Sequence, residues 1–427
     1  MNAGSHLDHW LARLEHLHPK EMDLGLDRVR TVWRRLGAPR PGRSVVTVAG
    51  TNGKGSVVAA LDAILRAQGL SVGVTTSPHL HRFNERIVIG GKQAPDDAIV
   101  AAFERIECAR ADISLTYFEF AILAAIELLA AADLDVAVLE VGLGGRLDAV
   151  NIIDADVAVI SSIDLDHEAW LGSDREAIGR EKAGILRRGH PVVIGDRDVP
   201  RSVLARAAEL DARVYRIGQD FDWMEGSTGG VFEGGVDRSF VLDCLPAAHL
   251  LASNLACALQ AASLLSLELD PGHVHHALSG LQLPGRMQRL HAGGVDWVLD
   301  VAHNPRAVQA LVAHLDEDRR WLAVFGAFAD KRVEAMVPPL AERAEVLFLV
   351  PTPGSRGQTA TALAERTRLK EPGPPVLCFA STEAALLTAL DQARQSNLGI
   401  VVAGSFTVVA TAAAWLEESA ERDLESA

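Results

Sequence analysis

The chain has 427 residues, more than the about 250 to 300 at which single hydrophobic cores stop growing, so two domains are expected. Apolar residues make up 48% and charged residues 23%, as in ordinary globular proteins, which excludes a disordered or fibrous chain. The formal net charge of -15 argues against a nucleic-acid-binding surface spread over the whole protein.

Membrane association and disulfide bonding are not expected either. The most apolar stretch, residues 118–141, is interrupted by acidic side chains that a bilayer-spanning helix would not tolerate. The first eighteen residues contain acidic residues and lack the apolar core of a secretion signal. The four cysteines lie far apart and form no C-x-x-C pair, which favours reduced thiols. We therefore expect a cytoplasmic protein with no membrane and no nucleic-acid partner.

The first part of the chain predicts an α/β fold with a parallel sheet. Short β-branched apolar runs alternate there with Ala/Leu-rich helical patterns. The expected strands are residues 44–49, 71–75, 136–141, 157–163 and 191–195. Each run ends near polar or glycine residues, and ligands in open α/β sheets bind outside the carboxyl ends of the strands. The chemistry should therefore lie in the loops that follow these strands.

The periodicity fades between Asp222 and Asp243 into a Gly-rich stretch, which predicts a pair of short antiparallel strands as a peripheral insertion. Beyond it the expected elements are a helix at 253–266, strands at 295–301, 321–325, 346–350 and 400–404, and a helix at 305–315. The boundary is placed near Pro284 to Gln288. It divides the chain into an N-terminal domain, 1–285, and a smaller C-terminal α/β domain, 286–427.

The strongest local signal is GTNGKGS, residues 50–56, between an expected strand and an expected helix. A glycine-rich turn at that point aims backbone N–H groups and the helix dipole at an anion, while Lys54 can reach phosphate oxygens. The spacing is shorter than that of the usual G-x-x-x-x-G-K-[ST] loop. The predicted phosphate-binding residues are Thr51, Asn52, Gly53, Lys54, Gly55 and Ser56.

A second glycine cluster, GLGGRL at residues 142–147, begins like a dinucleotide fingerprint. It has Leu147 where the third glycine should stand, and a phosphate loop already exists upstream. The pattern therefore argues against NAD binding.

The shortened phosphate loop resembles that of the ADP-forming amide ligases of the Mur ligase and folylpolyglutamate synthase superfamily. Seven further motifs resemble the folate branch in the same order: TTSPHL (75–80), LTYFEF (115–120), LEVGLGGRLDAVN (139–151), SSIDLDH (161–167), GREKAGI (179–185), LPGRMQ (283–288) and DVAHNP (300–305). The chain most closely resembles the bacterial bifunctional dihydrofolate synthases/folylpolyglutamate synthases. The resemblance implies a Mur-ligase-like phosphate-loop ATPase domain followed by a Rossmann-like ligase domain.

The resemblance also implies a reaction. ATP would activate a carboxylate as an acyl phosphate, and L-glutamate would then be joined to dihydropteroate or to tetrahydrofolates, with ADP released. Phosphoryl transfer of this kind depends on positioned cations and in-line geometry. The implied partners are small molecules: ATP, L-glutamate, dihydropteroate and reduced folates. A monomer is favoured.

Magnesium ligands are implied at Ser77, Glu140 and His167, with two Mg²⁺ ions expected and Mn²⁺ also suitable. Taken alone, Glu140 could be a strand-end salt-bridge partner and His167 an ordinary loop histidine. Lys182 could be a solvated surface lysine. The resemblance instead implies that carbon dioxide carbamylates Lys182, giving an anion that helps to hold the second ion. The implied catalytic residues are Lys54, Lys182 and His303.

Pterin-substrate contacts are implied in three segments. The residues are Asp23, Leu24, Thr116, Tyr117, Phe118, Glu119, Leu147, Asp148 and Ala149. Aromatic rings and a carboxylate suit a flat heterocycle with amino and lactam edges, although Tyr117 and Phe118 could equally belong to the core. The first two residues lie in EMDLGLDRV (21–29), whose pattern by default starts a surface helix. Matches at this segment and at LTYFEF favour dihydrofolate synthase activity in addition to chain extension.

Nucleotide contacts are also implied at Asn254, Arg286 and Asp300, with His303 nearby. Arg286 is suited to phosphate because its planar guanidinium stays charged, although a buried salt bridge with Asp300 is the alternative. Glutamate is expected between the domains, with Asp330, Lys331 and Ser405 as candidates. Lys331 could equally be a solvated loop charge.

Three alternative functions compete with this interpretation of the sequence. An enzyme that only extends folates would share the same catalytic core. A Mur-type peptide ligase usually carries a separate N-terminal domain, for which about 50 residues before the phosphate loop leave no room. A binding protein that uses ATP as a switch would not explain Glu140, His167 and Lys182 together.

Overall fold

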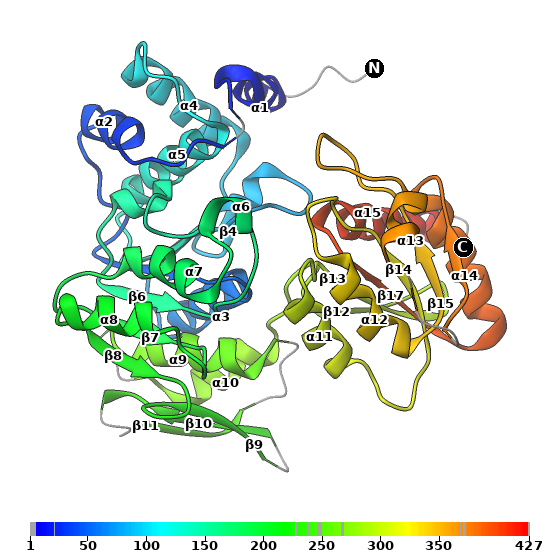
Figure 1. Cartoon of the computed structure of the whole chain (residues 1–427). Helices are drawn as coiled ribbons and strands as arrows, with labels where there is room; N and C mark the ends of the chain where they lie inside the picture. The colour runs from blue at the N-terminus through cyan, green and yellow to red at the C-terminus, as the bar shows by residue number, and fades with distance from the viewer. Residues whose placement is uncertain are drawn as a thin grey trace. The chain divides into compact units, whose positions relative to one another are not determined.

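The computed structural model describes residues 6–20, 22–226, 229–236, 240–245, 250–265, 269–367, 369 and 373–425. The chain forms two compact units, Met1–Leu281 and Gln282–Ala427, each with its own mainly parallel sheet (Figure 1). This division lies four residues before the boundary placed at 285 and 286. No described helix is both long enough and apolar enough to span a bilayer.

The first unit contains an eight-stranded sheet in the order β4-β3-β2-β5-β1-β6-β7-β8. Its strands are β1 (Ser44–Ala49), β2 (Val72–Thr75), β3 (Ile87–Ile89), β4 (Lys92–Gln93), β5 (Val136–Glu140), β6 (Val157–Ile160), β7 (Pro191–Ile194) and β8 (Arg213–Arg216). The β2–β3 and β3–β4 pairings are antiparallel, and all the other pairings in this sheet are parallel. β1, β2, β5, β6 and β7 agree with the predicted strands. The continuous burial of their Val, Ile and Ala side chains is what a sheet covered on both faces requires.

Helices cover both faces of this sheet. Figure 1 shows α7 (Arg175–Lys182) and α8 (Arg201–Glu209) on one side and α3 (Lys54–Ala67) and α9 (Ala252–Ser263) on the other. α10 (Pro271–Ser279) packs against α3. Four more helices, α1 (His6–Leu17), α2 (Asp27–Arg35), α4 (Asp96–Arg110) and α5 (Tyr117–Ala131), share an apolar core that also includes side chains of β1 and β5. Short helical turns are η1 (Phe83–Arg86), η2 (Ala149–Ile152), α6 (Glu168–Leu171) and η3 (Ala183–Ile185).

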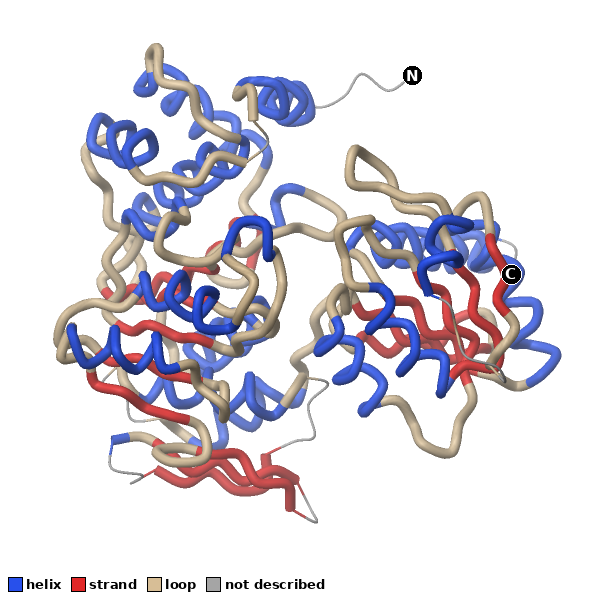
Figure 2. The backbone as a smooth tube through the Cα atoms, viewed as in Figure 1, coloured by secondary structure: helices blue, strands red, loops and turns tan. Residues whose placement is uncertain are grey.

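The Gly-rich stretch forms three antiparallel strands, not the predicted pair (Figure 2). They are β9 (Asp222–Gly226), β10 (Gly229–Gly234) and β11 (Phe240–Leu245), in the order β11-β10-β9. The prediction missed the third strand because it lies beyond the glycines that marked the first turn. The connections 227–228 and 237–239 lie outside the described residues. Gln260 on α9 ties this sheet to the unit, since its amide bonds the backbone N–H and C=O of Gly235 at 2.8 and 3.2 Å.

The second unit has a six-stranded sheet in the order β12-β13-β17-β14-β15-β16, parallel except for β12. Its strands are β12 (Gln288–Ala292), β13 (Val295–Asp300), β14 (Trp321–Phe325), β15 (Ala344–Leu349), β16 (Val376–Cys378) and β17 (Gly399–Ala403). Its helices are α11 (Pro305–His314), α12 (Val333–Arg343), α13 (Ala360–Thr367), α14 (Thr382–Ser396) and α15 (Phe406–Glu425). The two units confirm the predicted α/β class. The cysteines described as free thiols are Cys108, Cys257 and Cys378, while the side chain of Cys244 is not described.

Candidate functional site

The predicted phosphate loop joins β1 to α3, as its sequence indicates. Gly53 precedes the first helical residue with φ +84°, a conformation that glycine adopts without steric strain. Lys54 opens the helix, and its Nζ donates to the backbone oxygens of Gly50 and Thr51 at 3.1 and 3.5 Å. The loop therefore curls around its own lysine at a helix N-terminus, where backbone N–H groups favour an anion.

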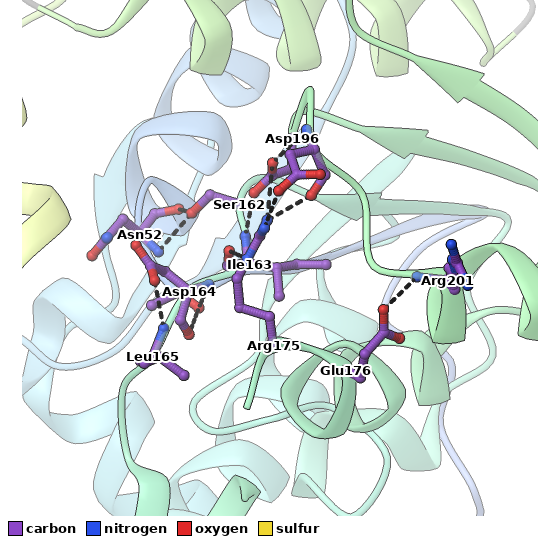
Figure 3. A network of polar contacts seen from close by, with 11 residues as sticks. Asn52, Ser162, Ile163, Asp164, Leu165, Arg175, Glu176, Asp196 and Arg201 are labelled. Carbon is purple, nitrogen blue, oxygen red and sulfur yellow. Dashed lines mark hydrogen bonds and ion pairs between the residues drawn. The ribbon is translucent and has the colours of Figure 1, made fainter. Parts of the chain in front are cut away.

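The loop after β6, residues 161–167, holds the phosphate loop from the side (Figure 3). The N–H of Thr51 donates to the backbone oxygen of Ser162 at 2.8 Å, and the N–H of Asn52 donates to Ser162 Oγ at 3.0 Å. The hydroxyl of Thr51 donates to the backbone oxygen of Asp164 at 3.1 Å and accepts from its N–H at 3.0 Å. Thr51 and Asn52 are thus fixed by protein contacts.

Asn254 belongs to the first unit and lies against the phosphate loop. It is on the first turn of α9 and is buried. A Cβ on Gly53 would lie 2.8 Å from the Asn254 side-chain carbon Cγ, closer than real Cβ contacts come. The amide therefore occupies the space beside Gly53 that any other residue would need.

Gly53→Ala is expected to weaken nucleotide binding and to lower stability. An L-residue in this left-handed conformation costs about 1 to 2 kcal/mol, and the new methyl group would also displace Asn254. Nucleotide affinity and the thermal midpoint are the measurements. Gly69→Ala is the matched control, because Gly69 has the same φ of +84° with nothing near its Cβ position. Equal nucleotide affinity in the two variants would contradict the role given to the Gly53–Asn254 contact.

Glu140, Ser77 and the phosphate loop come together at the carboxyl edge of the sheet. Glu140 is the last residue of β5 and is buried, and its Oε2 accepts the N–H of Ser77 at 3.2 Å. The same oxygen would lie 3.7 Å from a Cβ on Gly55. A buried carboxylate therefore faces both Ser77 and the phosphate loop.

His167 ends the loop after β6 and precedes α6. Its φ is +51°, which is uncommon for a non-glycine residue, and its N–H donates to Asp166 Oδ1 at 2.9 Å. Within the described chain, no three His, Cys, Asp or Glu side chains are grouped closely enough to hold a metal ion by themselves. The predicted set contains only two such side chains and a hydroxyl, so other oxygens would have to complete the coordination of an ion.

Lys182, the last residue of α7, is only 2% exposed, so the solvated-surface interpretation is wrong. The pKa of its amine is lowered to about 7, mainly by burial and also by the charge of Lys54, while Asp166 and Asp148 act in the opposite direction. These electrostatic partners bring together residues from the phosphate loop, the loop after β5 and the loop after β6. Lys182 is thus a buried amine beside the predicted phosphate site.

The glycines of GLGGRL allow their loop to pack closely against α7. This packing accounts for a glycine-rich sequence that looks like a dinucleotide fingerprint. A Cβ on Gly145 would lie 3.0 Å from the backbone oxygen of Glu181, and the N–H of Arg146 donates to that same oxygen at 2.8 Å. The loop therefore lies directly on the end of α7. Leu147 is half-buried and Ala149 is buried.

Asp148, in the same loop, is a buried carboxyl held by the backbone. Its oxygens accept the N–H groups of Leu143 at 2.8 Å and Val150 at 3.0 Å. Burial raises its pKa to about 6, against the lowering effects of these hydrogen bonds and of Lys54. The side chain is therefore fixed in direction next to Lys54 and Lys182.

Two of the predicted pterin segments are joined by Arg28, which the sequence reasoning did not single out. Its Nη1 donates to Asp23 Oδ2 at 2.6 Å, and its Nη2 donates to the Asp23 backbone oxygen at 2.6 Å and to Glu119 Oε1 at 3.1 Å. Glu119 also closes a capping box at the start of α5, accepting the N–H of Thr116 at 2.8 Å. Arg28 lies within the EMDLGLDRV segment, but the sequence did not indicate its ion pair with Glu119, which is 91 residues away.

Leu24 is half-buried beside Asp23, in the segment that leads into α2 at Asp27, while Glu21 lies outside the described residues. Tyr117 and Phe118 are half-buried and pack against the helical core, so core packing is part of their role. The Phe118 ring covers Gly142, whose Cβ would lie 2.8 Å from Phe118 Cε2. Phe118, on the first turn of α5, thus contacts the loop after β5.

Arg86 is a second residue that the sequence reasoning missed. Its guanidinium lies 5.6 Å from the ring centroid of Phe83 and 5.5 Å from that of Tyr117, and its Nε donates to His79 Nδ1 at 2.8 Å. It sits between the Ser77 segment and the predicted pterin segment. The surrounding sequence FNER, residues 83–86, matches no motif that would have indicated a site.

In the second unit, Arg286 and His303 lie against Phe406, and Asp300 lies near Arg286. The Arg286 guanidinium lies 5.3 Å from the Phe406 ring centroid, and the His303 ring lies 6.1 Å from it. Asp300 accepts the N–H groups of Met287 and Ala302, both at 2.8 Å. Burial raises the pKa of Asp300, while Arg286 opposes that shift. Asp300 thereby fixes the LPGRMQ turn, in which Met287 has a φ of +42°.

The candidate glutamate-binding residues of the second unit differ in exposure. Lys331 is 6% exposed, so it is not a solvated loop charge, and Ser405 is buried as well. Asp330 pairs with Arg356 through contacts of 3.1 and 2.6 Å. The Lys331 side chain is therefore buried in this loop, whereas Asp330 is engaged with Arg356 at the surface.

Comparison with known proteins agrees with this geometry. The family model "Mur ligase middle domain" matches residues 48–228, and "Mur ligase, glutamate ligase domain" matches residues 285–406. The dihydrofolate synthase/folylpolyglutamate synthase of Escherichia coli (strain K12) is 41% identical over 411 residues, covering 96% of this chain and 95% of the relative. The chain belongs to this family of Mur ligases. The predicted family is thereby confirmed.

Solved structures of Mur ligase family members extend the similarity to three dimensions. E. coli FolC in complex with DHPP and ADP matches with a TM-score of 0.90 at 40% identity, covering 97% of this chain and 98% of that one. A bifunctional folylpolyglutamate synthase/dihydrofolate synthase with Mn, AMPPNP and L-glutamate bound matches with a TM-score of 0.87 at 42% identity, with the same coverage. Both structures confirm the predicted two-domain α/β architecture.

Proposed function

We propose that the chain is an ATP-dependent, ADP-forming ligase that joins L-glutamate to 7,8-dihydropteroate and also to tetrahydrofolates, through an acyl phosphate. The observation that carries this proposal is the 41% identity to a bifunctional relative over 96% of the chain. The phosphate loop, the buried Glu140 and the buried Lys182 at one sheet edge give this similarity a chemical basis.

ATP would be bound first through the phosphate loop. The backbone N–H groups of residues 53–56 would donate to phosphate oxygens, while Ser162 holds the N–H groups of Thr51 and Asn52. The Lys54 ammonium would leave its backbone acceptors for the phosphate. Asn254 packs against Gly53 and would limit the shape of the nucleotide pocket. We assign nucleotide contacts in the second unit to Arg286 and Asp300, with His303 as a catalytic candidate.

The residues at the sheet edge fit a hard divalent cation. Glu140 supplies a buried carboxylate oxygen, Ser77 a hydroxyl and His167 an imidazole, and phosphate oxygens of ATP would complete the coordination. We propose Mg²⁺ as the physiological ion, with two ions bound and Mn²⁺ as a substitute. When bound, the cation would neutralise charge on the transferring phosphoryl group.

Lys182 suits carbamylation because the reaction needs an uncharged amine. Addition of carbon dioxide to the neutral amine forms the carbamate N–C bond and releases one proton. Burial already lowers the pKa of this amine to about 7, so much of it is uncharged at neutral pH. The carbamate would be an anion among Lys54 and the proposed metal ligands.

The pterin substrate would lie among the Asp23–Leu24 segment, the start of α5 and the loop that carries Leu147, Asp148 and Ala149. Arg28 links the first two of these segments, and Phe118 packs between the last two. The fixed carboxyl of Asp148 provides a directed partner for the amino and lactam edges of a pterin. We assign glutamate recognition to the second unit, with Lys331 and Ser405 as candidates.

Arg28→Gln is expected to raise the KM for dihydropteroate about ten- to a hundredfold. The change removes charged hydrogen bonds worth about 1.5 to 3 kcal/mol each that hold Asp23 and Glu119 together. The KM for ATP should stay close to that of the unmodified chain. Arg110→Gln is the control, since Arg110 makes a comparable bidentate contact with Glu107 at 2.6 and 2.7 Å on α4. An unchanged KM for dihydropteroate in Arg28→Gln would remove this segment from the substrate site.

ADP release by the purified chain tests the proposed function. Mg-ATP and L-glutamate would be supplied with either 7,8-dihydropteroate or tetrahydrofolate as acceptor. ADP formation with both acceptors is expected. Turnover with tetrahydrofolate alone would reduce the function to folylpolyglutamate synthase, and turnover with neither would contradict the proposal and direct the search to other carboxylates, such as those of Mur-type peptide ligases.

A further inference from the structure

The loop after β6 is held from two sides, and only one side belongs to the predicted phosphate site. Ser162 and Asp164 hold Thr51 and Asn52, as described above. Ile163, the residue between them, turns its backbone the other way, toward Asp196 and Arg175 (Figure 3). Neither of these two residues is part of any motif described above.

The contacts on that second side address both backbone groups of Ile163. Its N–H donates to Asp196 Oδ2 at 2.9 Å, and its C=O accepts from Arg175 Nε at 3.0 Å. Arg175 Nη2 lies 3.4 Å from Asp196 Oδ1, so the two side chains also pair with each other. Arg175 is held in turn by Asp198, whose backbone oxygen accepts from Nη2 at 2.6 Å and whose carboxylate pairs with Nη1.

The burial of Asp196 makes this arrangement rigid. Its side chain is 2% exposed, and its second oxygen accepts the N–H of Asp198 at 3.0 Å. A buried carboxylate is stable only when its oxygens are satisfied, so its hydrogen bonds fix its direction. Ile163 is therefore located by a charged pair whose carboxylate is buried and whose arginine is partly exposed.

The sheet order explains why this pair can act on the nucleotide site. β1, β6 and β7 are adjacent parallel strands, so the phosphate loop, the loop 161–167 and Asp196 follow three neighbouring strand ends at one edge. Arg175 is the first residue of α7, and Lys182 is its last. The pair thus connects the helix that carries Lys182 to the loop that carries His167.

We propose that Arg175 and Asp196 are positioning residues for nucleotide and metal binding. By fixing the backbone of Ile163, they set the positions of Thr51 and Asn52 on one side and of His167 four residues further on. They contact neither ATP nor metal themselves. This inference rests on the proposed function, because it requires that the loop 50–56 binds ATP.

A matched pair exists at the opposite end of the same strands. Asp156 Oδ2 accepts the N–H of Val45 at 2.7 Å and pairs with Arg40 Nη2 at 2.6 Å. This pair has the same chemistry, a carboxylate that joins an arginine and a backbone N–H, but it lies before β6 rather than after it. Asp156→Asn therefore serves as a control for the purely structural contribution of such a pair.

The test measures binding of AMPPNP, with Mn²⁺ present, to the full chain carrying Arg175→Met, Arg175→Lys, Asp196→Asn or Asp156→Asn. Partners that orient primary ligands typically change affinity about ten- to a hundredfold, so Arg175→Met and Asp196→Asn should weaken AMPPNP by this factor. The half-saturating Mn²⁺ concentration should rise in parallel, and the KM for dihydropteroate should change less than about twofold. Arg175→Lys keeps the positive charge but lacks the planar guanidinium group. Its AMPPNP affinity should therefore lie between that of Arg175→Met and that of the unmodified chain.

Asp156→Asn should lower the thermal midpoint while leaving AMPPNP affinity unchanged. Unchanged AMPPNP affinity in Arg175→Met, or an equal loss in Asp156→Asn, would overturn the positioning role. If Asp196→Asn does not fold, the comparison of Arg175→Lys with Arg175→Met decides the question, and equal AMPPNP affinity in those two variants would also count against the proposal. If the unmodified chain does not bind AMPPNP, the proposed function fails and this inference fails with it.

Discussion

Lys182→Ala is expected to lower activity by about a hundred- to a thousandfold while the protein stays folded. The variant removes the buried amine on which a carbamate would form, beside Lys54 and the proposed metal ligands. Electrostatic groups of this kind contribute about 3 to 4 kcal/mol or more to phosphoryl transfer, and each 1.4 kcal/mol corresponds to a tenfold change in rate. ADP release with dihydropteroate and L-glutamate is the measurement.

Chemical rescue separates the carbamate from the lysine itself. Short carboxylic acids could occupy the space left by Lys182→Ala and supply the missing anion, so partial recovery of ADP release is expected. Lys182→Arg provides the control, because it keeps a positive charge, cannot be carbamylated and leaves no space for the acid. If neither carboxylic acids nor bicarbonate restore the activity of Lys182→Ala, the result would show that the lysine is essential but would contradict its carbamylation.

The pH dependence of the same residue follows from its lowered pKa. Below a pH of about 7 the buried amine of Lys182 is protonated and cannot add carbon dioxide, so activity should fall as the pH falls through 7. The free energy of unfolding should change with pH in the same direction as the activity. Between about pH 7 and the ordinary lysine pKa of 10.5 the unfolded chain binds the extra proton, so stability should rise with pH in carbon-dioxide-free buffer. Lys182→Met should remove this part of the pH dependence.

Glu140→Gln is expected to lower turnover about a hundred- to a thousandfold. Glutamine has nearly the same shape and can still accept the N–H of Ser77, but it removes the negative charge that faces the phosphate loop. The half-saturating Mg²⁺ concentration should increase strongly, because a hard cation prefers a carboxylate oxygen to a neutral amide. Steady-state ADP release over a range of Mg²⁺ concentrations is the measurement.

Asp135→Asn is the control for Glu140→Gln. Asp135 lies just before β5, at the other end of the strand that Glu140 ends, and its Oδ2 accepts the N–H of Ser71 at 2.9 Å. Asp135→Asn should lower the thermal midpoint at least as much as Glu140→Gln does, with little effect on the Mg²⁺ dependence of turnover. Near-normal turnover of folded Glu140→Gln would remove Glu140 from the metal site. His167→Ala should reproduce the loss if the histidine shares that site.

The alternation of strand and helix patterns gave reliable predictions of the fold. Five strands of the first sheet and the phosphate loop were predicted from local runs of residues, because a strand buried on both faces must be apolar throughout. The strands β3, β4, β8, β12 and β16 were not predicted, since four of them lie at sheet edges and the fifth, β3, has only three residues. The third strand of the small antiparallel sheet was missed, although Gly234 and Gly235 stand at the end of β10, before β11.

The candidate site shows where local patterns stop being informative. The sequence placed Asp23 and Glu119 in the same predicted pterin pocket only by resemblance, whereas the structure shows Arg28 joining them. Arg175 and Asp196 belong to no motif, and their common partner Ile163 is an ordinary apolar residue in the sequence. Such contacts join residues far apart in the chain, so no local spacing can indicate them.

The sequence by itself determined the fold class, the phosphate loop and the family, because these depend on periodicity and on motifs a few residues long. Only the tertiary structure decided that Lys182 and Lys331 are buried, since burial depends on which elements pack over a residue and not on its neighbours in the chain. It also decided that Asn254 fills the space beside Gly53. The ionisation of Lys182 follows from that packing, because removing water from around an amine destabilises its charged form.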